Sequence, residues 1–272
     1  MDLFSGTGGF SWGFHKLGFN IKLAVDNWKP AAKNYLENFP GTELINKNIL
    51  DLVPSNFEKV DIIIGSPPCQ EFSVGHNISQ IKYPDLTLVA KFFEFVKELK
   101  PKLFIMENVP NILNSLKFEP YIKLNYANYG VPQSRTRVFF GLDNKPPISH
   151  VPYEKSLDPK LKKWIHISEI LDLNNKNKGY KILYARSMNC CANSPYKTIH
   201  APARTITTRA PKIIYKDKVL RDFTTEEMAL AQGFPEDFKF NVSKYNCYKM
   251  IGNAVSPKVS YAIAKMIKEE RA

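Results

Sequence analysis

The sequence predicts an α/β fold with a doubly wound, mostly parallel sheet, and two regularities carry this prediction. Short apolar runs alternate with segments of helical periodicity, and polar or glycine-rich turns follow the runs. The expected strands are MDLF (1–4), IKLAV (21–25), VDIII (60–64), KLFIM (102–106) and RVFFG (137–141). The expected helices are 10–18, 29–38, 86–99, 224–232 and 256–271. Because such sheets bind ligands outside the carboxyl ends of their strands, the informative residues should follow the strands.

The last two helices carry recognisable start signals. Thr224 or Thr225 can cap the first of them, with Glu227 in its first turn. Ser256 is the expected N-cap of the C-terminal helix, with Pro257 at its first position and basic residues near its end.

Length and composition are typical of a soluble globular protein. The chain has 272 residues, 44% apolar and 24% charged, which suffices for one large domain or two modest ones. No run approaches the roughly 18 apolar residues of a membrane span, and the first residues do not resemble a secretory signal. The cysteines at 69, 190, 191 and 247 form neither a disulfide framework nor a zinc-ligand spacing. We therefore expect a cytoplasmic protein without a metal site.

Positive charge is concentrated in one region of the chain. The sequence carries 38 Lys and Arg against 26 Asp and Glu, a net charge of +12. Residues 141–220 hold 15 basic and 6 acidic side chains and account for +9 of it. Prolines recur there and periodicity is weak, which predicts an irregular small domain or a long insertion. The charge favours a polyanion such as nucleic acid as partner, although a lysine-rich solvated surface explains it equally well.

The segment DLFSGTGGF (2–10) is typical of a strand, a glycine turn and a helix start. Its three glycines let the backbone turn tightly and approach a ligand. No Gly-Lys-Ser/Thr follows as in a phosphate loop, and Ser11 stands where the dinucleotide fingerprint has its third glycine. Asp26 ends the second strand, where a carboxylate can meet ribose hydroxyls. A nucleoside cofactor without a pyrophosphate fits this pattern, and S-adenosylmethionine is such a cofactor, although glycine turns of this kind are common elsewhere.

The segment GSPPCQEFS (65–73) places a thiol at the same predicted edge of the sheet. Cys69 lies beyond an apolar strand, in a turn that Pro67 and Pro68 stiffen, whereas a structural cysteine normally lies inside an apolar run. A nearby cation or helix N-terminus would lower the pKa of this thiol and supply a nucleophilic thiolate. Position alone leaves two interpretations open, a nucleophile or an ordinary turn cysteine.

Two further motifs bring charged side chains to this edge. Glu107, in FIMENVP (104–110), follows the next strand directly and is either a surface cap or a proton donor and hydrogen-bond partner for a ring nitrogen. Arg135 and Arg137, in VPQSRTRVFF (131–140), alternate as they enter a strand, so both should point to one face. They form either an exposed basic strand or a guanidinium site over a carbonyl oxygen.

Together and in this order, these motifs resemble the cytosine-C5 DNA methyltransferase family of prokaryotic type. The resemblance rests on DLFSGTGGF, GSPPCQEFS, MENVP, QSRTR, FTTEEMALAQGFP and MIGNAV, which span both ends of the chain. It implies a Rossmann-like, S-adenosylmethionine-dependent catalytic domain made of residues 1–141 and 246–272. Residues 142–245 would form a small target-recognition domain and hinge. The family's variable region lies between the QSRTR and QGFP elements, where this chain carries its basic excess.

The resemblance implies covalent catalysis on cytosine. Cys69 would add to C6 of the ring, so that C5 can attack the methyl group of S-adenosylmethionine. Glu107 would pair with N3 and the exocyclic amine, and the backbone at Pro68 would help to read that amine. Arg137, with Arg135, would hold the O2 carbonyl. A base inside a duplex cannot be reached, so the target cytosine must be flipped out.

The resemblance also assigns the cofactor pocket. Phe4 would stack on the adenine, Asp26 would hold the ribose hydroxyls, and Asn253 would complete the pocket from the C-terminal end. The full expected set is Phe4, Ser5, Gly6, Thr7, Gly8, Gly9, Asp26, Asn27, Trp28, Asn48, Ile49, Ser66, Pro68, Leu88, Asn253 and Ala254.

Three features depart from the family pattern. Asn48 stands where the family usually has an aspartate for the adenine amine, so it can still form a hydrogen bond but carries no charge. The segment 107–133 is shorter than expected, as if a helix and part of a strand were trimmed, which puts the sheet edge in question. The chain also begins almost on the first motif, leaving little first strand.

Several readings of the function stay open from the sequence. The same chemistry could act on tRNA, because the motifs report the base and not the polymer. An inactive DNA-binding relative would not need Cys69, Glu107 and Arg137 together. A nicotinamide dehydrogenase is disfavoured by Ser11. The expected partners are double-stranded DNA and a candidate cognate restriction endonuclease, and we expect a monomer without membrane association.

Overall fold

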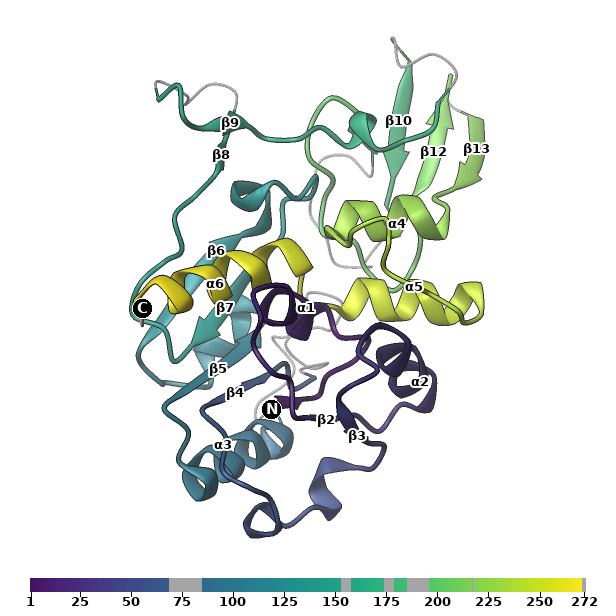
Figure 1. Cartoon of the computed structure of the whole chain (residues 1–272). Coiled ribbons are helices and arrows are strands. Elements are labelled where there is room, and N and C mark those ends of the chain that lie inside the picture. Colours follow the sequence, from purple (N-terminus) through teal and green to yellow (C-terminus); the bar gives the residue numbers. More distant parts are fainter. Residues whose placement is uncertain (69–84, 153–157, 174–178, 185–195, 217, 271–272) are drawn as a thin grey trace.

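The computed structural model describes residues 1–68, 85–152, 158–173, 179–184, 196–216 and 218–270. Its centre is a seven-stranded sheet with the order β3-β2-β1-β4-β5-β7-β6 (Figure 1). The strands are β1 (Asp2–Leu3), β2 (Leu23–Val25), β3 (Glu43–Ile45), β4 (Ile62–Gly65), β5 (Leu103–Asn108), β6 (Tyr121–Asn125) and β7 (Thr136–Phe140). Only β7 runs antiparallel to its neighbours, so the sheet is mostly parallel, as predicted.

Helices cover both faces of this sheet, because successive residues of each strand point to opposite sides. The helices are α1 (Gly9–Lys16), α2 (Lys29–Asn38), α3 (Thr87–Leu99), α4 (Thr225–Gln232), α5 (Lys244–Asn253) and α6 (Pro257–Glu270). Ile64 and Ile105 pack with α1 and α6 on one face. Their strand neighbours Ile63 and Met106 pack with α3 on the other face. The doubly wound arrangement therefore follows from the apolar strands themselves.

The elements predicted for residues 1–141 are confirmed with small shifts of their ends. Two strands of the sheet, β3 and β6, were not predicted. β6 alternates exposed and buried residues, with Lys123 between the buried Ile122 and Leu124. A short, half-polar strand of this kind offers too few apolar residues to be recognised from sequence. It pairs along the whole of β7, so the sheet edge that the sequence put in question is complete.

The shortened connection from β5 to β6 contains only the 3₁₀ helix η5 (Pro110–Asn114). The trimmed helix that the sequence indicated is thus absent from this connection. Phe118, in this connection, packs against α3 and β5, because its ring lies 4.9 Å from that of Phe93 and 5.8 Å from that of Phe104. Ile112 is fully buried in the same cluster. The sheet face remains covered despite the missing helix.

The region predicted to be irregular also contains short strands that were not predicted. Its strands are β8 (His150–Val151), β9 (Lys162–Lys163), β10 (Tyr180–Leu183), β11 (Tyr196–Thr198), β12 (Lys212–Tyr215) and β13 (Lys218–Asp222). The last four form an antiparallel sheet of order β11-β10-β12-β13. These strands are short and rich in lysine, which hides their period. We call the described residues of 142–223 the small lobe.

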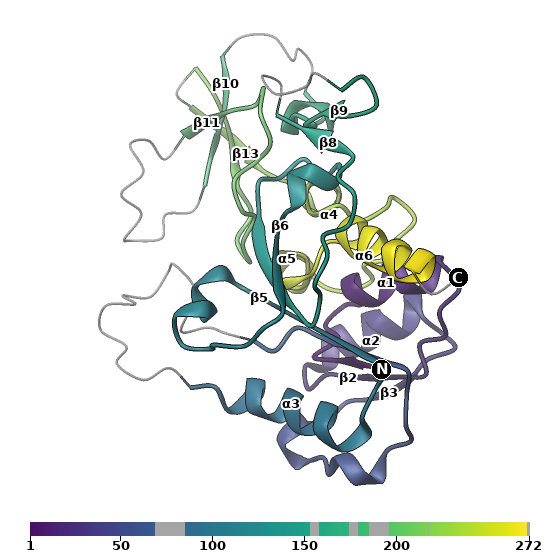
Figure 2. The same cartoon turned by 90° about the vertical axis from the view of Figure 1, so that its left-hand side faces the viewer.

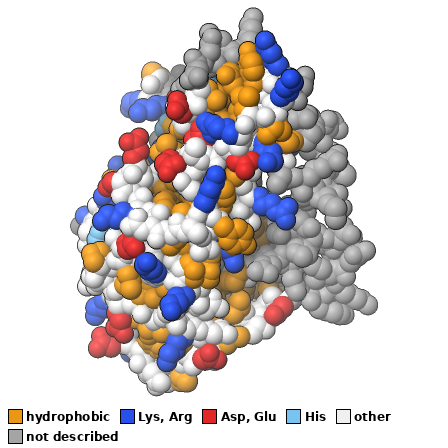
Figure 3. Space-filling view, turned by 90° about the vertical axis from the view of Figure 1, so that its right-hand side faces the viewer, with side chains coloured by type: hydrophobic (Ala, Val, Ile, Leu, Met, Phe, Trp, Pro, Cys, Tyr) orange, Lys and Arg blue, Asp and Glu red, His pale blue; other side chains and the backbone are white. Residues whose placement is uncertain are grey.

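Figures 1 and 2 show the small lobe above the seven-stranded sheet, with α4 and α5 between the two. The predicted domain boundary at residue 246 falls inside α5, and the division into domains stays a prediction. On the face drawn in Figure 3, Asp and Glu side chains lie among those of Lys and Arg. That face therefore carries both signs of charge.

The start signals of α4 and α6 have different outcomes. Thr224 caps α4, because its hydroxyl accepts from the N–H of Glu227 and the Glu227 carboxylate accepts from the N–H of Thr224. α6 begins at Pro257, as predicted. The Ser256 hydroxyl is buried without a hydrogen-bond partner among the described residues, so it does not act as the expected cap.

None of the described helices is both long and apolar enough to cross a membrane.

Candidate active site

The glycine turn after β1 is held by close packing on one side and is open on the other. A side chain on Gly8 would collide with the ring of Phe39, and one on Gly9 with the carbonyl oxygen of Val255. Both positions therefore require glycine, because α2 and the turn before α6 press against the loop. At Gly6, which has a φ of +54°, an added Cβ would meet nothing within 4 Å. The backbone at Gly6 thus borders open space where a ligand can approach.

Asp26 closes this loop from the end of β2. Its carboxylate accepts hydrogen bonds of 2.8 Å from the N–H groups of both Gly6 and Trp28. Burial raises the pKa of this carboxyl above its ordinary value, and the two N–H donors oppose that shift. The side chain therefore links the glycine loop to the Trp28 turn, at the position where the sequence predicted ribose recognition.

Two buried hydroxyls at this edge lack partners. Ser5 follows β1 and Ser66 follows β4, and these strands pair side by side. Neither side-chain oxygen has a hydrogen-bond partner among the described residues. Buried hydroxyls are normally paired, so a polar ligand lying across these strand ends would satisfy them. The open space at Gly6 and these two orphaned hydroxyls fit a nucleoside cofactor such as S-adenosylmethionine.

Other residues of the predicted cofactor pocket surround this edge. Phe4 directly follows β1 and has a φ of +60°, an uncommon value for a residue with a side chain. Ile49 is buried, and the Asn48 side-chain oxygen accepts from the N–H of Leu50 (3.1 Å). The ammonium of Lys249, on α5, lies 4.5 Å from the ring centroid of Trp28.

The remaining predicted residues differ in exposure. Asn253 is exposed at the end of α5, and Ala254 behind it lies near Gly9. Leu88 is half-buried on α3, and Asn27 is exposed. The cofactor roles of these four residues stay predictions.

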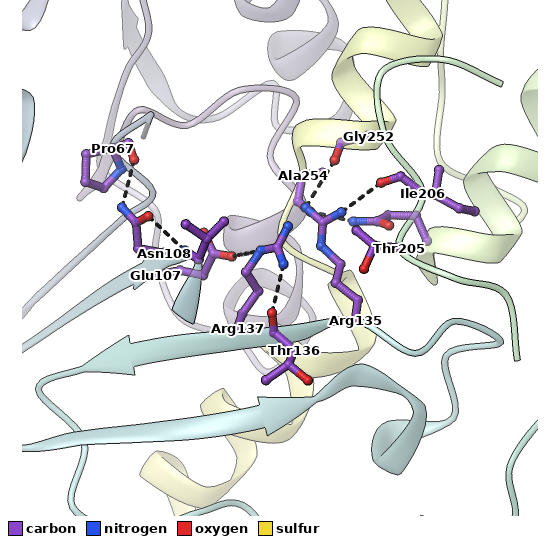
Figure 4. A network of polar contacts seen from close by, with 12 residues as sticks. Pro67, Glu107, Asn108, Arg135, Thr136, Arg137, Thr205, Ile206, Gly252 and Ala254 are labelled. Atoms are coloured by element: carbon purple, nitrogen blue, oxygen red, sulfur yellow. Dashed lines mark hydrogen bonds and ion pairs between the residues drawn. The ribbon is translucent and has the colours of Figure 1, made fainter. Parts of the chain in front are cut away.

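Glu107 and Arg137 form a buried ion pair at the same side of the sheet (Figure 4). The Nε of Arg137 lies 3.1 Å from Oε1 of Glu107, and the two side chains are 13% and 9% exposed. Glu107 is paired with Phe139 in the β5–β7 ladder, so Arg137 is its diagonal neighbour on the same face. The sheet register therefore brings together two of the predicted catalytic side chains.

Arg135 is placed differently from Arg137. Its guanidinium donates to the carbonyl oxygens of Ile206 (2.9 Å) and Gly252 (3.1 Å). Burial, followed by the charge of Arg137, lowers the pKa of Arg135 to about 10, so it stays charged at neutral pH. It ties the start of β7 to the small lobe and to α5, as Figure 4 shows.

Three amides that were not singled out from the sequence support this site. Asn108 donates to the carbonyl oxygen of Pro67 (3.1 Å) and so holds the start of the Cys69 turn against β5. Gln133 donates to the side chain of Gln232 (2.6 Å) and accepts from the N–H of Ile206 (2.7 Å). All three lie inside the quoted motifs, but their hydrogen bonds join segments far apart in the chain.

Cys69 itself lies outside the described residues, as do Cys190 and Cys191. Pro68, the last residue before this gap, is exposed. Cys247 is a free, buried thiol on α5. Among the residues that the structure describes, no group of His, Cys, Asp and Glu is arranged to hold a metal ion.

The sheet order, the glycine loop and the motif residues at one edge are those of a methyltransferase with a Rossmann-like α/β fold. Residues 1–187 and 174–269 match the family described as C-5 cytosine-specific DNA methylase. The chain belongs to this family and is a DNA cytosine-C5 methyltransferase.

Curated relatives align over nearly the whole chain. The type II methyltransferase M.FnuDI of Fusobacterium nucleatum is 31% identical, covering 99% of this chain and 94% of the relative. The type II methyltransferase M.HindV of Haemophilus influenzae is 34% identical, covering 98% and 95%.

Solved structures show the same fold. A protein described as a DNA modification methyltransferase, encoded within an E. coli prophage, has a TM-score of 0.67 at 22% identity, covering 98% of this chain and 97% of that one. The S. pombe Dnmt2 methyltransferase has a TM-score of 0.65 at 18% identity, covering 100% and 98%.

Proposed function

We propose that this methyltransferase acts on a flipped-out cytosine in duplex DNA through a covalent bond between Cys69 and C6. The proposal rests on the buried ion pair between Glu107 and Arg137. Glu107 lies on β5, and the next residue, Asn108, donates a hydrogen bond to the carbonyl oxygen of Pro67. A carboxylate and a guanidinium on one sheet face match the ring nitrogen and carbonyl of cytosine. The turn that leads to Cys69 begins beside them.

The proposed roles follow from the chemistry of the ring. The Cys69 thiolate adds to C6, and the electron pair of the C5–C6 bond makes C5 nucleophilic. Glu107 donates a proton or a hydrogen bond at N3 and offsets the negative charge that develops in the ring. Arg137 holds the O2 carbonyl. When bound, S-adenosylmethionine supplies the methyl group. A base then removes the C5 proton, and the thiolate leaves as the C5–C6 double bond reforms.

We assign Arg135 a structural role instead of a place at the base. Two of its N–H groups already donate to main-chain carbonyls, and the side chain is only 3% exposed. Arg137 is therefore the better candidate for the cytosine O2. Arg135 would support it by fixing the start of β7.

The cofactor would lie over the open side of the glycine loop. The main chain from Gly6 to Gly9 would contact its methionine end, and Asp26 would meet the ribose hydroxyls. Ser5 and Ser66 would gain the hydrogen-bond partners that they lack. Phe4, Trp28 and Ile49 would surround the adenine, and Asn48 would meet its amine.

Duplex DNA is the preferred polymer, and the small lobe would read it. The relatives M.FnuDI and M.HindV are named type II methyltransferases, so we propose the modification role of a restriction-modification system, with a cognate endonuclease as partner. We further propose that the enzyme is a monomer and works in the cytoplasm, where it can reach cellular DNA. The same chemistry on tRNA is the second candidate, because the site residues report the base alone.

A methyl-transfer assay tests the proposal. Purified protein with radiolabelled S-adenosylmethionine should label duplex DNA and not tRNA, and Cys69→Ser should abolish the labelling. Cys247→Ala removes another thiol and should keep the activity. A duplex with 5-fluorocytosine at the target should form a stable protein–DNA adduct with wild type and not with Cys69→Ser, because fluorine cannot leave as a proton does. Full activity of Cys69→Ser would exclude the covalent mechanism. Labelling of tRNA alone would show that the substrate is tRNA and not DNA. Bisulfite sequencing of DNA from expressing cells identifies the target sequence.

A further inference from the structure

A fully buried asparagine connects the cofactor loop to a distant part of the chain. Asn34, on α2, is 0% exposed. Its Nδ2 donates to the hydroxyl of Thr7 (2.5 Å), and its Oδ1 accepts from the main-chain N–H of Asn241 (3.2 Å). Asn241 belongs to the connecting segment, residues 233–243, between α4 and α5. One side chain therefore touches two regions that are separated by more than two hundred residues.

The orientation of the Asn34 amide follows from its partners. A main-chain N–H can only donate, so the atom that faces Asn241 must be the oxygen. The NH₂ group then faces Thr7, whose hydroxyl has to accept. We call this chain of two hydrogen bonds the Asn34 bridge. Donation runs in one direction along it, from Asn241 to Asn34 and from Asn34 to Thr7.

Thr7 is held from below the cofactor loop. Its side chain is buried, with 2% exposure, whereas the backbone at the neighbouring Gly6 borders open space. The hydroxyl thus serves the protein interior, and the main chain of the loop remains available to a ligand. If its partner were lost, the Thr7 oxygen could not reach water, and the loop would have to shift to satisfy it.

The same helix makes a second contact with the connecting segment. Asn38, one turn after Asn34, accepts from the N–H of Lys239 (2.9 Å) and donates to its carbonyl oxygen (3.0 Å). Asn38 is half-buried, and its amide also donates to the main-chain carbonyl oxygen of Asn34 (2.9 Å). Its side chain binds the same segment but does not form the hydrogen bond to Thr7 that the Asn34 side chain forms, so the chain itself offers a matched control.

We propose that Asn34 is a positioning residue for the cofactor, which fixes the glycine loop through Thr7 against the connecting segment. The inference rests on the proposed function, since it takes S-adenosylmethionine as the ligand of the loop. It adds a determinant of cofactor affinity that lies beneath the pocket and touches no part of the ligand. It also means that the Asn34 side chain holds both the cofactor loop and the connecting segment.

Titration calorimetry with S-adenosylhomocysteine tests this role in the full chain. Asn34→Leu keeps the branching and the number of side-chain heavy atoms but removes both hydrogen bonds, and we expect about tenfold weaker binding. Asn38→Leu should change the affinity less than about twofold. Thr7→Val removes the acceptor and should match Asn34→Leu, whereas Thr7→Ser keeps the hydroxyl and should restore binding. In steady-state assays the KM for S-adenosylmethionine should rise while kcat stays within about twofold of wild type.

A double-mutant cycle separates this role from a general loss of folding. If the bridge acts as one unit, Asn34→Leu combined with Thr7→Val binds no more weakly than either single variant. Unchanged affinity in Asn34→Leu, equal losses in Asn34→Leu and Asn38→Leu, or additive losses in the cycle would each overturn the inference and leave the proposed function intact. A wild-type protein that does not bind S-adenosylhomocysteine would overturn the cofactor assignment itself. Thermal unfolding of every variant reports whether it is folded. If Asn34→Leu does not fold, the comparison of Thr7→Val with Thr7→Ser still tests the bridge.

Discussion

Glu107 and Asn108 are neighbours on β5 with different partners. Successive side chains of a strand point to opposite sides, so Glu107 meets Arg137 while Asn108 meets the carbonyl oxygen of Pro67. The pair of residues therefore serves the proposed base-binding face and the Cys69 turn at once.

Replacing Glu107 tests its proposed chemical role. Glu107→Gln keeps the shape and the contact with Arg137 but loses the exchangeable proton, and we expect turnover to fall by about 100-fold or more. Binding of S-adenosylhomocysteine should not change. Glu98→Gln, on the exposed side of α3, is the matched control. Methyl transfer and calorimetry measure the two effects, and equal turnover in both variants would contradict the role.

Asp2 is a second buried carboxylate, below the glycine loop. It accepts from the Ser11 hydroxyl (2.6 Å), and burial raises its pKa to about 7. The folded state therefore holds this proton more tightly than the unfolded chain. Its contribution to stability is complete below about pH 4 and is lost as the pH rises toward 7.

The Asp2→Asn variant should lose this pH dependence. Between pH 5 and 7 the free energy of unfolding of wild type should fall more steeply with pH than that of the variant, by roughly 1 kcal/mol per pH unit. Asp51→Asn, at an exposed position, should follow wild type. Denaturant unfolding at several pH values measures the slopes, and parallel slopes for wild type and Asp2→Asn would exclude this titration.

At the scale of elements, the start of β7 is the junction of the molecule. Gln133 and Arg135 contact the main chain around Ile206, and Arg135 also reaches Gly252 at the end of α5. Two residues later, Arg137 turns to Glu107. One short segment thus joins the small lobe and α5 to the sheet and then supplies a proposed catalytic group.

Exchanging each arginine for lysine separates the two functions. Arg135→Lys cannot serve both carbonyl oxygens, so we expect it to lower the free energy of unfolding by about 2 kcal/mol. Arg137→Lys keeps a charge near Glu107 and should cost less stability, but it should lower turnover strongly, because an ammonium cannot reproduce the planar guanidinium. Denaturant unfolding and methyl transfer distinguish these outcomes. A larger stability loss in Arg137→Lys would reverse the assignment.

At the scale of the whole molecule, positive charge is distributed unevenly along the chain. The small lobe carries most of the net charge of +12. Within it, burial and then the nearby Arg204 lower the pKa of Lys197, so two cations lie close together. Like charges held near each other favour a bound anion such as a DNA phosphate.

Salt dependence of DNA binding tests whether these two cations contact DNA. The logarithm of the association constant should fall linearly with the logarithm of salt concentration, with a slope of about −0.9 per neutralised phosphate. Replacing Lys197 and Arg204 together by glutamine should reduce the slope by about 2. Replacing Lys29 and Lys33 on α2 removes the same charge and should leave it unchanged. Fluorescence anisotropy with a labelled duplex between about 50 and 200 mM salt gives the slopes. Equal effects of the two double replacements would exclude Lys197 and Arg204 from the DNA interface.

The local pattern of the chain determined the main sheet and the composition of the site. Each of β1, β2, β4, β5 and β7 is an apolar run, and a quoted motif follows or enters most of them, so strand, turn and functional residue are adjacent in the sequence. The small lobe was expected from its charge and irregular pattern, but its strands were not predicted. They are short and carry lysines, so pairing with neighbouring strands, and not their own pattern, stabilises them.

Only the tertiary structure decided which polar groups meet. The alternation of Arg135 and Arg137 predicted one face, yet their partners come from β5 in one case and from Ile206 and Gly252 in the other. The Asn34 bridge joins residues 7, 34 and 241, a set that no local pattern contains. Hydrogen bonds depend on distance and direction in space, whereas a sequence records only order along the chain. The motifs therefore identified the family, and packing determined which of their polar side chains meet.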